Sequence, residues 1–103
     1  MVMSEILVLS TTDTLELARK IANALVEEHE AACVNIIPGV RSVYRWEGSL
    51  CDEAEFLLLI KSTSEKFESI RSRIRLLHTY QVPEVIAVPI TAGDPLYLAW
   101  LRA

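Results

Sequence analysis

The chain of 103 residues has few glycines and few basic residues, and each shortage excludes a class of function. Its three glycines, Gly39, Gly48 and Gly93, are too scattered for a Walker loop or a Rossmann dinucleotide-binding pattern. Ten basic against fourteen acidic residues give a net charge of −4, which argues against nucleic-acid or anionic-membrane binding. A G-x-S-x-G nucleophile motif is also missing. We therefore expect no catalytic activity.

Cysteines and long apolar segments are equally scarce. The two cysteines, Cys33 and Cys51, do not form a C-x-x-C motif, and we expect both to be free thiols. No segment approaches the ~18 apolar residues of a transmembrane helix, and the N-terminus lacks the basic and apolar regions of a signal peptide. We expect a cytoplasmic protein without membrane contact, built as a single domain over residues 1–103.

The apolar pattern predicts a β-α-β-β-α-β order with a short terminal helix. Pro38-Gly39 is typical of a turn between two strands, and Asp13 with Glu16 fits the start of the first helix. Asp94-Pro95 fits the start of the last helix. The predicted strands are 5–11, 52–61, 84–90 and the segments 32–37 and 40–47, which count as one strand of this order unless the Pro38-Gly39 bend is their boundary. The predicted long helices are 13–29 and 63–78.

This order is that of the split βαβ, or ferredoxin-like, α+β sandwich. Right-handed crossovers place both long helices on one face of the sheet. The other face is then bare, although residues 6–9 and 56–60 are apolar on both sides of their strands. Monomers rarely expose an apolar face of that size. We therefore predict that further copies of the chain cover it.

Tyr44 and Trp46 lie two residues apart in segment 40–47, so a strand places both rings on one face. Arg41 and Arg45 alternate with them, and aromatic and arginine side chains are enriched where proteins dock. This favours a contact surface. The alternative is an amphipathic strand whose rings cover the core of the protein's own chain.

His78, at the end of the second predicted helix, can bind a metal, act as a base, or interact with the helix dipole. Glu55 and Glu84 could add oxygen ligands, and Cys33 a thiolate. Their spacing resembles no closed zinc motif. The residues alone favour a structural role for His78.

Five motifs, in order and from about residue 6 to the end, closely resemble the CutA divalent-cation-tolerance proteins. They are AACVNIIPG (31–39), Y-x-W-x-G (44–48), LLLIK (57–61), H-x-Y-x-x-P-E (78–84) and YL-x-WL (97–101). The resemblance implies a ferredoxin-like protomer in a tight trimer similar to the PII signalling proteins. It also implies an association with tolerance to copper and other divalent cations, and no established catalytic activity.

Two positions depart from the family pattern. Thr79 stands where the family usually has proline, and Ser10 stands where some members carry a cysteine proposed as a copper ligand. A hydroxyl is a poorer ligand for Cu(I) than a thiolate. His78 is then the carried-over metal candidate, so we expect weak copper binding and no required cofactor.

These observations leave three hypotheses. The first is a cytoplasmic homotrimer that responds to divalent metal through weak binding near His78. The second is a PII-like sensor that binds a small metabolite or anion in clefts between subunits, near Tyr44, Trp46, Tyr80 and Glu84. The third is a hydrolase or transferase that uses Cys33 or His78.

Overall fold

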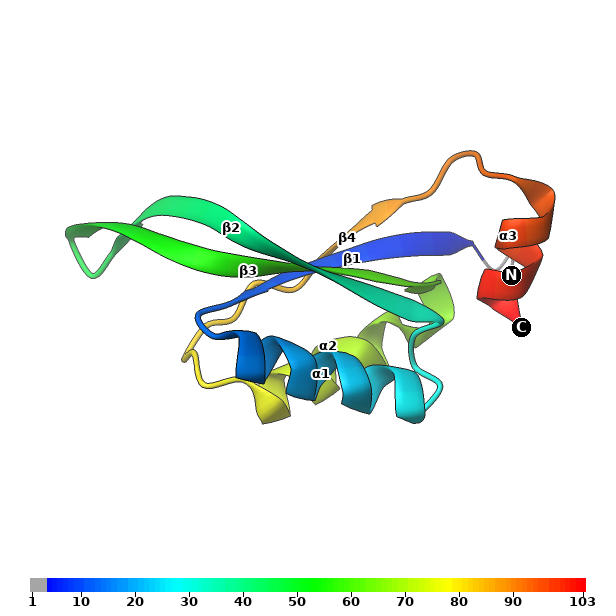
Figure 1. The fold of residues 1–103 in the computed structure, drawn as a ribbon, viewed down its shortest axis with the longest axis horizontal. Coiled ribbons are helices and arrows are strands. Elements are labelled where there is room, and N and C mark those ends of the chain that lie inside the picture. The colour runs from blue at the N-terminus through cyan, green and yellow to red at the C-terminus, as the bar shows by residue number, and fades with distance from the viewer. Residues whose placement is uncertain (1–3) are drawn as a thin grey trace.

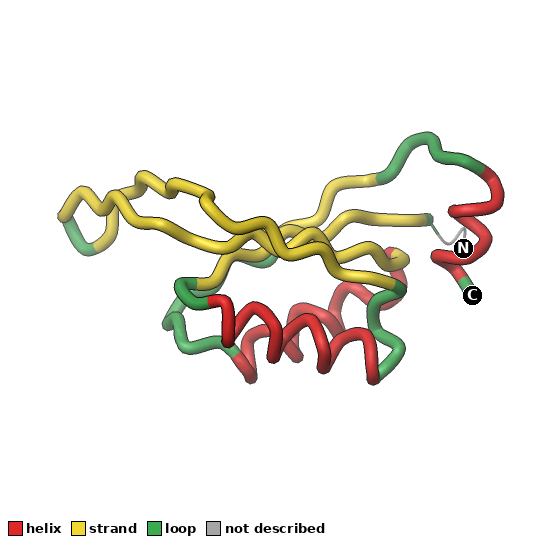
Figure 2. The backbone as a smooth tube through the Cα atoms, viewed as in Figure 1, coloured by secondary structure: helices red, strands yellow, loops and turns green. Residues whose placement is uncertain are grey.

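The computed structural model describes residues 4–103 as a four-stranded sheet with helices packed on it. The elements are β1 (Glu5–Thr12), α1 (Leu15–Glu27), β2 (Cys33–Trp46), β3 (Ser49–Thr63), a 3-10 turn (Ser64–Lys66), α2 (Phe67–Leu77), β4 (Ile86–Pro89) and α3 (Pro95–Arg102). The strand order is β2-β3-β1-β4, and all neighbours are antiparallel. Helices α1 and α2 cover the same face, while α3 lies at one end of the sheet (Figures 1 and 2). The predicted ferredoxin-like α+β fold is confirmed.

The core lies between the two long helices and the facing side of β1 and β3. The strands contribute Ile6, Val8, Leu58 and Ile60, and the helices contribute Leu17, Ala18, Ile21, Leu25, Ile70 and Ile74. Burial of one such side chain stabilises the fold by about 1.5–3 kcal/mol. The N-cap of helix α1 lies one residue later than predicted, because Thr14, and not Asp13, accepts the capping hydrogen bond from the Leu17 N–H.

The predicted turn at Pro38-Gly39 is wrong, because β2 runs through both residues. Ile37 pairs with Leu57 and Val40 pairs with Glu55, so β2 has one more residue than β3 between these pairs. The extra residue is a β-bulge, and Gly39 adopts φ 79° there. Side chains alternate along a strand, so the bulge places the even-numbered Tyr44 on the same face as the odd-numbered Ile37.

Strands β2 and β3 form a hairpin that extends beyond the helices (Figure 1). Glu47 and Gly48 turn the chain with φ 48° and 81°, the positive values that a tight two-residue hairpin turn needs. None of residues 41–50 is buried. The radius of gyration is 14.3 Å, above the roughly 13 Å of a compact chain of this length. The hairpin accounts for this elongation.

The face of the sheet opposite α1 and α2, here called the open face, carries partly exposed apolar side chains. Strand pairing places these residues on it together: Leu7, Leu9, Ile37, Leu57, Leu59, Ile86 and Val88. The bare apolar face that the sequence predicts is therefore present in the chain.

Within residues 4–103, no helix is both long enough and apolar enough to cross a membrane. Cys33 and Cys51 are both free thiols, as predicted.

Candidate functional site

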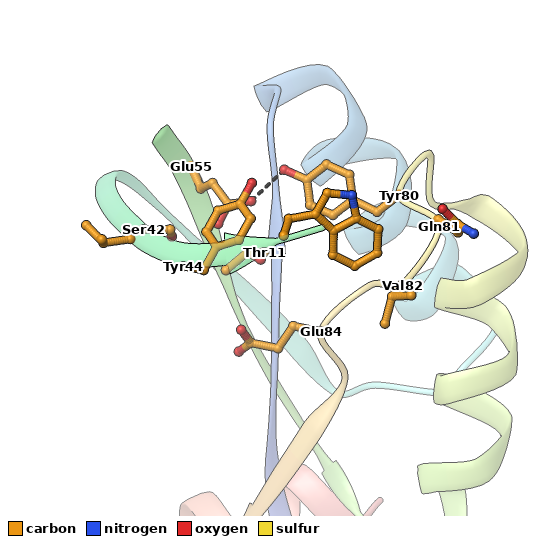
Figure 3. Close-up of a pocket in the computed structure, with 10 residues that line it drawn as sticks. Thr11, Ser42, Tyr44, Glu55, Tyr80, Gln81, Val82 and Glu84 are labelled. Carbon is orange, nitrogen blue, oxygen red and sulfur yellow. Dashed lines mark hydrogen bonds between the residues drawn. The ribbon is translucent and has the colours of Figure 1, made fainter. Parts of the chain in front are cut away.

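A pocket of about 560 Å³ lies where the hairpin meets the loop that follows α2 (Figure 3). Its lining comes from three strands and that loop: Thr11, Ser42, Val43, Tyr44, Trp46, Glu55, Tyr80, Gln81, Val82 and Glu84. The four residues that the sequence predicts for a ligand cleft, Tyr44, Trp46, Tyr80 and Glu84, all line this one pocket. That they bind a ligand stays a prediction.

The bulge in β2 and the register of the hairpin bring these side chains together. Tyr44 pairs with Cys51 and Val40 pairs with Glu55, so Tyr44 and Glu55 share the open face. The loop after α2 then approaches the same face with Tyr80. Glu55 is only 6% exposed, which is unusual for a carboxylate with no cationic partner among residues 4–103.

Hydrogen bonds from two phenols hold the acidic side chains of this region. The Tyr80 hydroxyl donates to Glu55 Oε2 at 2.5 Å, and the Tyr44 hydroxyl donates to Glu53. Burial, followed by the Glu55 hydrogen bond, raises the pKa of Tyr80 above its ordinary value. The Glu53 hydrogen bond is the main cause that raises the pKa of Tyr44. Both phenols therefore stay neutral donors at physiological pH.

The electrostatic character of the pocket is acidic. Its lining residues, all within the described part of the chain, include no Lys, Arg or His. The ion pairs found among residues 4–103 involve neither Glu55 nor Glu84. Partial burial, followed by the charge of Glu55, raises the pKa of Glu84. Such a site disfavours an anion, so the anionic form of the predicted metabolite cleft has no electrostatic support.

His78 is buried beside this pocket, and each of its two ring nitrogens forms a hydrogen bond with a backbone group. Its Nδ1 accepts a hydrogen bond from the Tyr80 N–H at 3.1 Å. The proton must then be on Nε2, which donates to the Thr11 carbonyl oxygen at 2.7 Å. A metal ion at His78 would have to displace one of these partners. Metal binding by His78 stays a prediction, and its structural role is visible.

The sulfur candidate, Cys33, does not lie near His78. Cys33 pairs with Lys61 on β3, and its Sγ lies 3.9 Å from the Tyr97 hydroxyl oxygen. Lys61 in turn pairs with Leu7 on β1. Leu7 is about 13 Å along β1 from the Thr11 that binds His78. Cys33 and His78 therefore do not form a catalytic dyad. Across residues 4–103, no group of three or more His, Cys, Asp or Glu side chains is placed to hold a metal ion.

Sequence reasoning missed the link between Glu55 and Tyr80. Glu55 was considered as a metal ligand, and Tyr80 as part of the cleft, but nothing in their spacing indicates a hydrogen bond. The bond that joins them depends on how the loop after α2 packs against β3. Sequence reasoning also missed the contributions of Thr11 and Ser42 to the pocket lining.

Fold and site together define an α+β protein of the split βαβ class, with an acidic and aromatic pocket at the base of a long hairpin. Residues 6–103 match the family model described as CutA1 divalent ion tolerance protein. The chain belongs to this family.

Similar proteins span bacteria, archaea and plants. The divalent-cation tolerance protein CutA of Thermus thermophilus is 51% identical over 98 residues, which cover 95% of each chain, and a solved Thermus structure superposes with a TM-score of 0.92. The periplasmic divalent cation tolerance protein CutA of Archaeoglobus fulgidus is 37% identical with a TM-score of 0.91, and 94% of each chain is covered. The chloroplastic CutA of Arabidopsis thaliana is 46% identical over 94% of this chain, which spans about half of that protein (53%).

Proposed function

We propose that this chain takes part in divalent-cation tolerance as a cytoplasmic homotrimer that binds a divalent cation, such as copper, weakly and without turnover. Membership of the CutA1 divalent ion tolerance family supports the tolerance role. The observation that carries cation binding is the acidic pocket, because Glu55 and Glu84 face it without a basic partner among residues 4–103.

The open face and the hairpin support assembly. An isolated chain would leave Ile86 50% exposed, Val88 41% exposed and the Trp46 ring 41% exposed. Apolar patches of this kind mark interfaces. Copies of the chain provide complementary apolar surface, and the projecting hairpin can reach a neighbour. Light scattering should give about three times the 11.6 kDa of one chain, and a single-chain mass in dilute buffer would refute the assembly.

The weakness of the proposed metal site follows from its ligands. Hard cations prefer several oxygen ligands, whereas this region offers two carboxylates, one of which accepts the Tyr80 hydrogen bond. Recruiting His78 would add a nitrogen ligand, at the cost of a bond to Thr11 or Tyr80. We therefore propose a weakly held cation on Glu84 and Glu55, with His78, which binds the pocket residues Thr11 and Tyr80, as a further candidate ligand.

Calorimetric titration with Cu(II) and Zn(II) tests this site. Glu84→Gln should weaken binding, and Glu16→Gln, an exposed position on α1, should not. His78→Gln is preferable to His78→Ala, because an amide can keep part of the hydrogen bonding. If Glu84→Gln and His78→Gln both titrate with copper like the wild type, the site is assigned wrongly.

The cytoplasmic location rests on different support. Both cysteines are free thiols, as is usual in a reducing compartment. Relatives named chloroplastic and periplasmic show that location differs within the family. Fractionation of cells that express the tagged natural gene tests this part of the proposal.

A second candidate function is a sensor of a small molecule. It is favoured by the pocket itself, because about 560 Å³ lies within the roughly 300–1,000 Å³ of small-molecule sites. Titration with a panel of nucleotides and amines would detect it, and Tyr80→Phe should reduce any binding found. Absence of binding by every compound would count against it.

A further inference from the structure

The pocket has more room than a metal ion needs. A bare divalent cation is smaller than a water molecule, whose share of liquid volume is about 30 Å³, and the pocket volume is about 560 Å³. The remaining wall is largely aromatic and aliphatic, with the rings of Tyr44, Trp46 and Tyr80 and the side chains of Val43 and Val82. Such a wall suits a ligand with an apolar body.

The charge of the ligand follows from the same residues. Aromatic faces attract cations through the negative face of the ring quadrupole. Two of the rings donate their hydroxyl protons to carboxylates, Tyr80 to Glu55 and Tyr44 to Glu53. A phenol bonded in this way carries more electron density on its ring. The carboxylate of Glu84, which also lines the pocket, adds further negative charge (Figure 3).

From this combination of aromatic faces, carboxylates and volume, the geometry points to an organic cation, an alkylated ammonium group, as the ligand of this pocket. The inference rests on the second function proposed above and names its ligand class. It is independent of metal binding, because the attraction comes from ring faces and from charge at a distance, with no coordination bond.

The test uses tetramethylammonium chloride against tert-butanol, an uncharged molecule of similar size, with sodium chloride as the salt control. The wild-type protein is used in its assembled form, so a pocket filled by a neighbouring subunit would show no binding. Binding is followed by calorimetry and by the NMR signal of the Trp46 indole N–H. We expect tetramethylammonium to bind and tert-butanol to bind at least about fivefold more weakly.

Variants locate the effect. Trp46→Leu keeps an apolar side chain but removes the ring face. At a concentration where sedimentation shows it as fully assembled as the wild type, it should bind tetramethylammonium about fivefold more weakly. Glu84→Gln removes one charge and should weaken it about threefold. Trp100→Leu is the matched control, since Trp100 is also an exposed tryptophan but lies on α3, outside this pocket. The Trp100→Leu variant should bind tetramethylammonium as strongly as the wild type.

Three results would overturn the inference. The first is no binding at about 100 mM tetramethylammonium, a concentration far above the dissociation constant expected of such a cage. The others are equally strong binding of tert-butanol, or a Trp100→Leu variant whose binding is weakened as much as that of Trp46→Leu. The metal and nucleotide titrations keep its failure separate from that of the proposed functions. A nucleotide that binds while tetramethylammonium does not would leave the sensor function standing and remove the organic cation. Copper binding without tetramethylammonium binding would leave the metal function standing and exclude the organic cation.

Discussion

The Tyr80 hydroxyl and the Glu55 carboxylate are joined by a 2.5 Å hydrogen bond between the loop after α2 and strand β3. This bond fixes the loop against the sheet and satisfies a carboxylate that is almost fully buried. It ties the wall of the pocket to the fold.

Tyr80→Phe should destabilise the protein, because it leaves the buried Glu55 without its donor. Bonds to charged groups are worth about 1.5–3 kcal/mol, and the partial exposure of Tyr80 lowers our expectation to about 1–2 kcal/mol. Urea unfolding measures the loss. Tyr44→Phe is the matched control, since its partner Glu53 is exposed and loses little. Equal losses in both variants would show that burial of Glu55 does not matter.

His78→Ala should cost about 2–4 kcal/mol of folding free energy, because it removes bonds to Thr11 and Tyr80 and leaves a cavity. His29→Ala is the control, with an exposed histidine after α1. Thermal unfolding with and without copper would separate stability from metal binding. A His78→Ala protein that is as stable as the wild type would contradict the structural role.

Glu84→Gln should stabilise the protein at pH 7 by a few tenths of a kcal/mol, since solvent screens much of the effect. The folded pKa of Glu84 is raised by partial burial and by Glu55. Such a group stabilises the fold below its unfolded pKa, about 4.3, and loses that contribution as pH rises through the folded value. The advantage of glutamine should therefore vanish below about pH 4.

Urea unfolding of both proteins at pH 7 and at about pH 3.5 checks this sign. Glu16→Gln gives the opposite sign at pH 7, because Glu16 lies in the first turn of α1 and interacts favourably with the helix dipole. A Glu84→Gln protein that is less stable than the wild type at pH 7 would show that the carboxylate has a cationic partner in the assembly.

Trp46→Ala should weaken assembly by about 2 kcal/mol or more if the ring is a central anchor of the interface. Leu76→Ala is the control, because Leu76 is 75% exposed on α2, away from the hairpin. Sedimentation over a dilution series measures both. If both variants dissociate at the same protein concentration as the wild type, Trp46 is not part of the interface.

Most of the architecture could be predicted from the sequence, because periodicity reports local burial directly. The helix containing Leu17, Ile21 and Leu25 follows from spacing alone, and so does the two-sided apolar strand around Leu58. The Pro38-Gly39 bulge could not be predicted, since the same residues fit a turn equally well and strand pairing decides between the two structures. The candidate site was predicted as a set of residues, through the family resemblance. The hydrogen bonds within the site could not be predicted, because they depend on strand register and loop packing.

The single extra residue in β2 has a consequence for how this hairpin can change. If Pro38 and Gly39 each paired with one residue of β3, Val40 would lie opposite Ala54, and every side chain from Val40 to Trp46 would exchange sides. The rings would then point toward the helix layer, and Arg41, Val43 and Arg45 would take their places. The sandwich below would keep its packing. The face on which the hairpin presents Tyr44 and Trp46 is therefore set by the bulge in the backbone, and not by the identity of any one side chain.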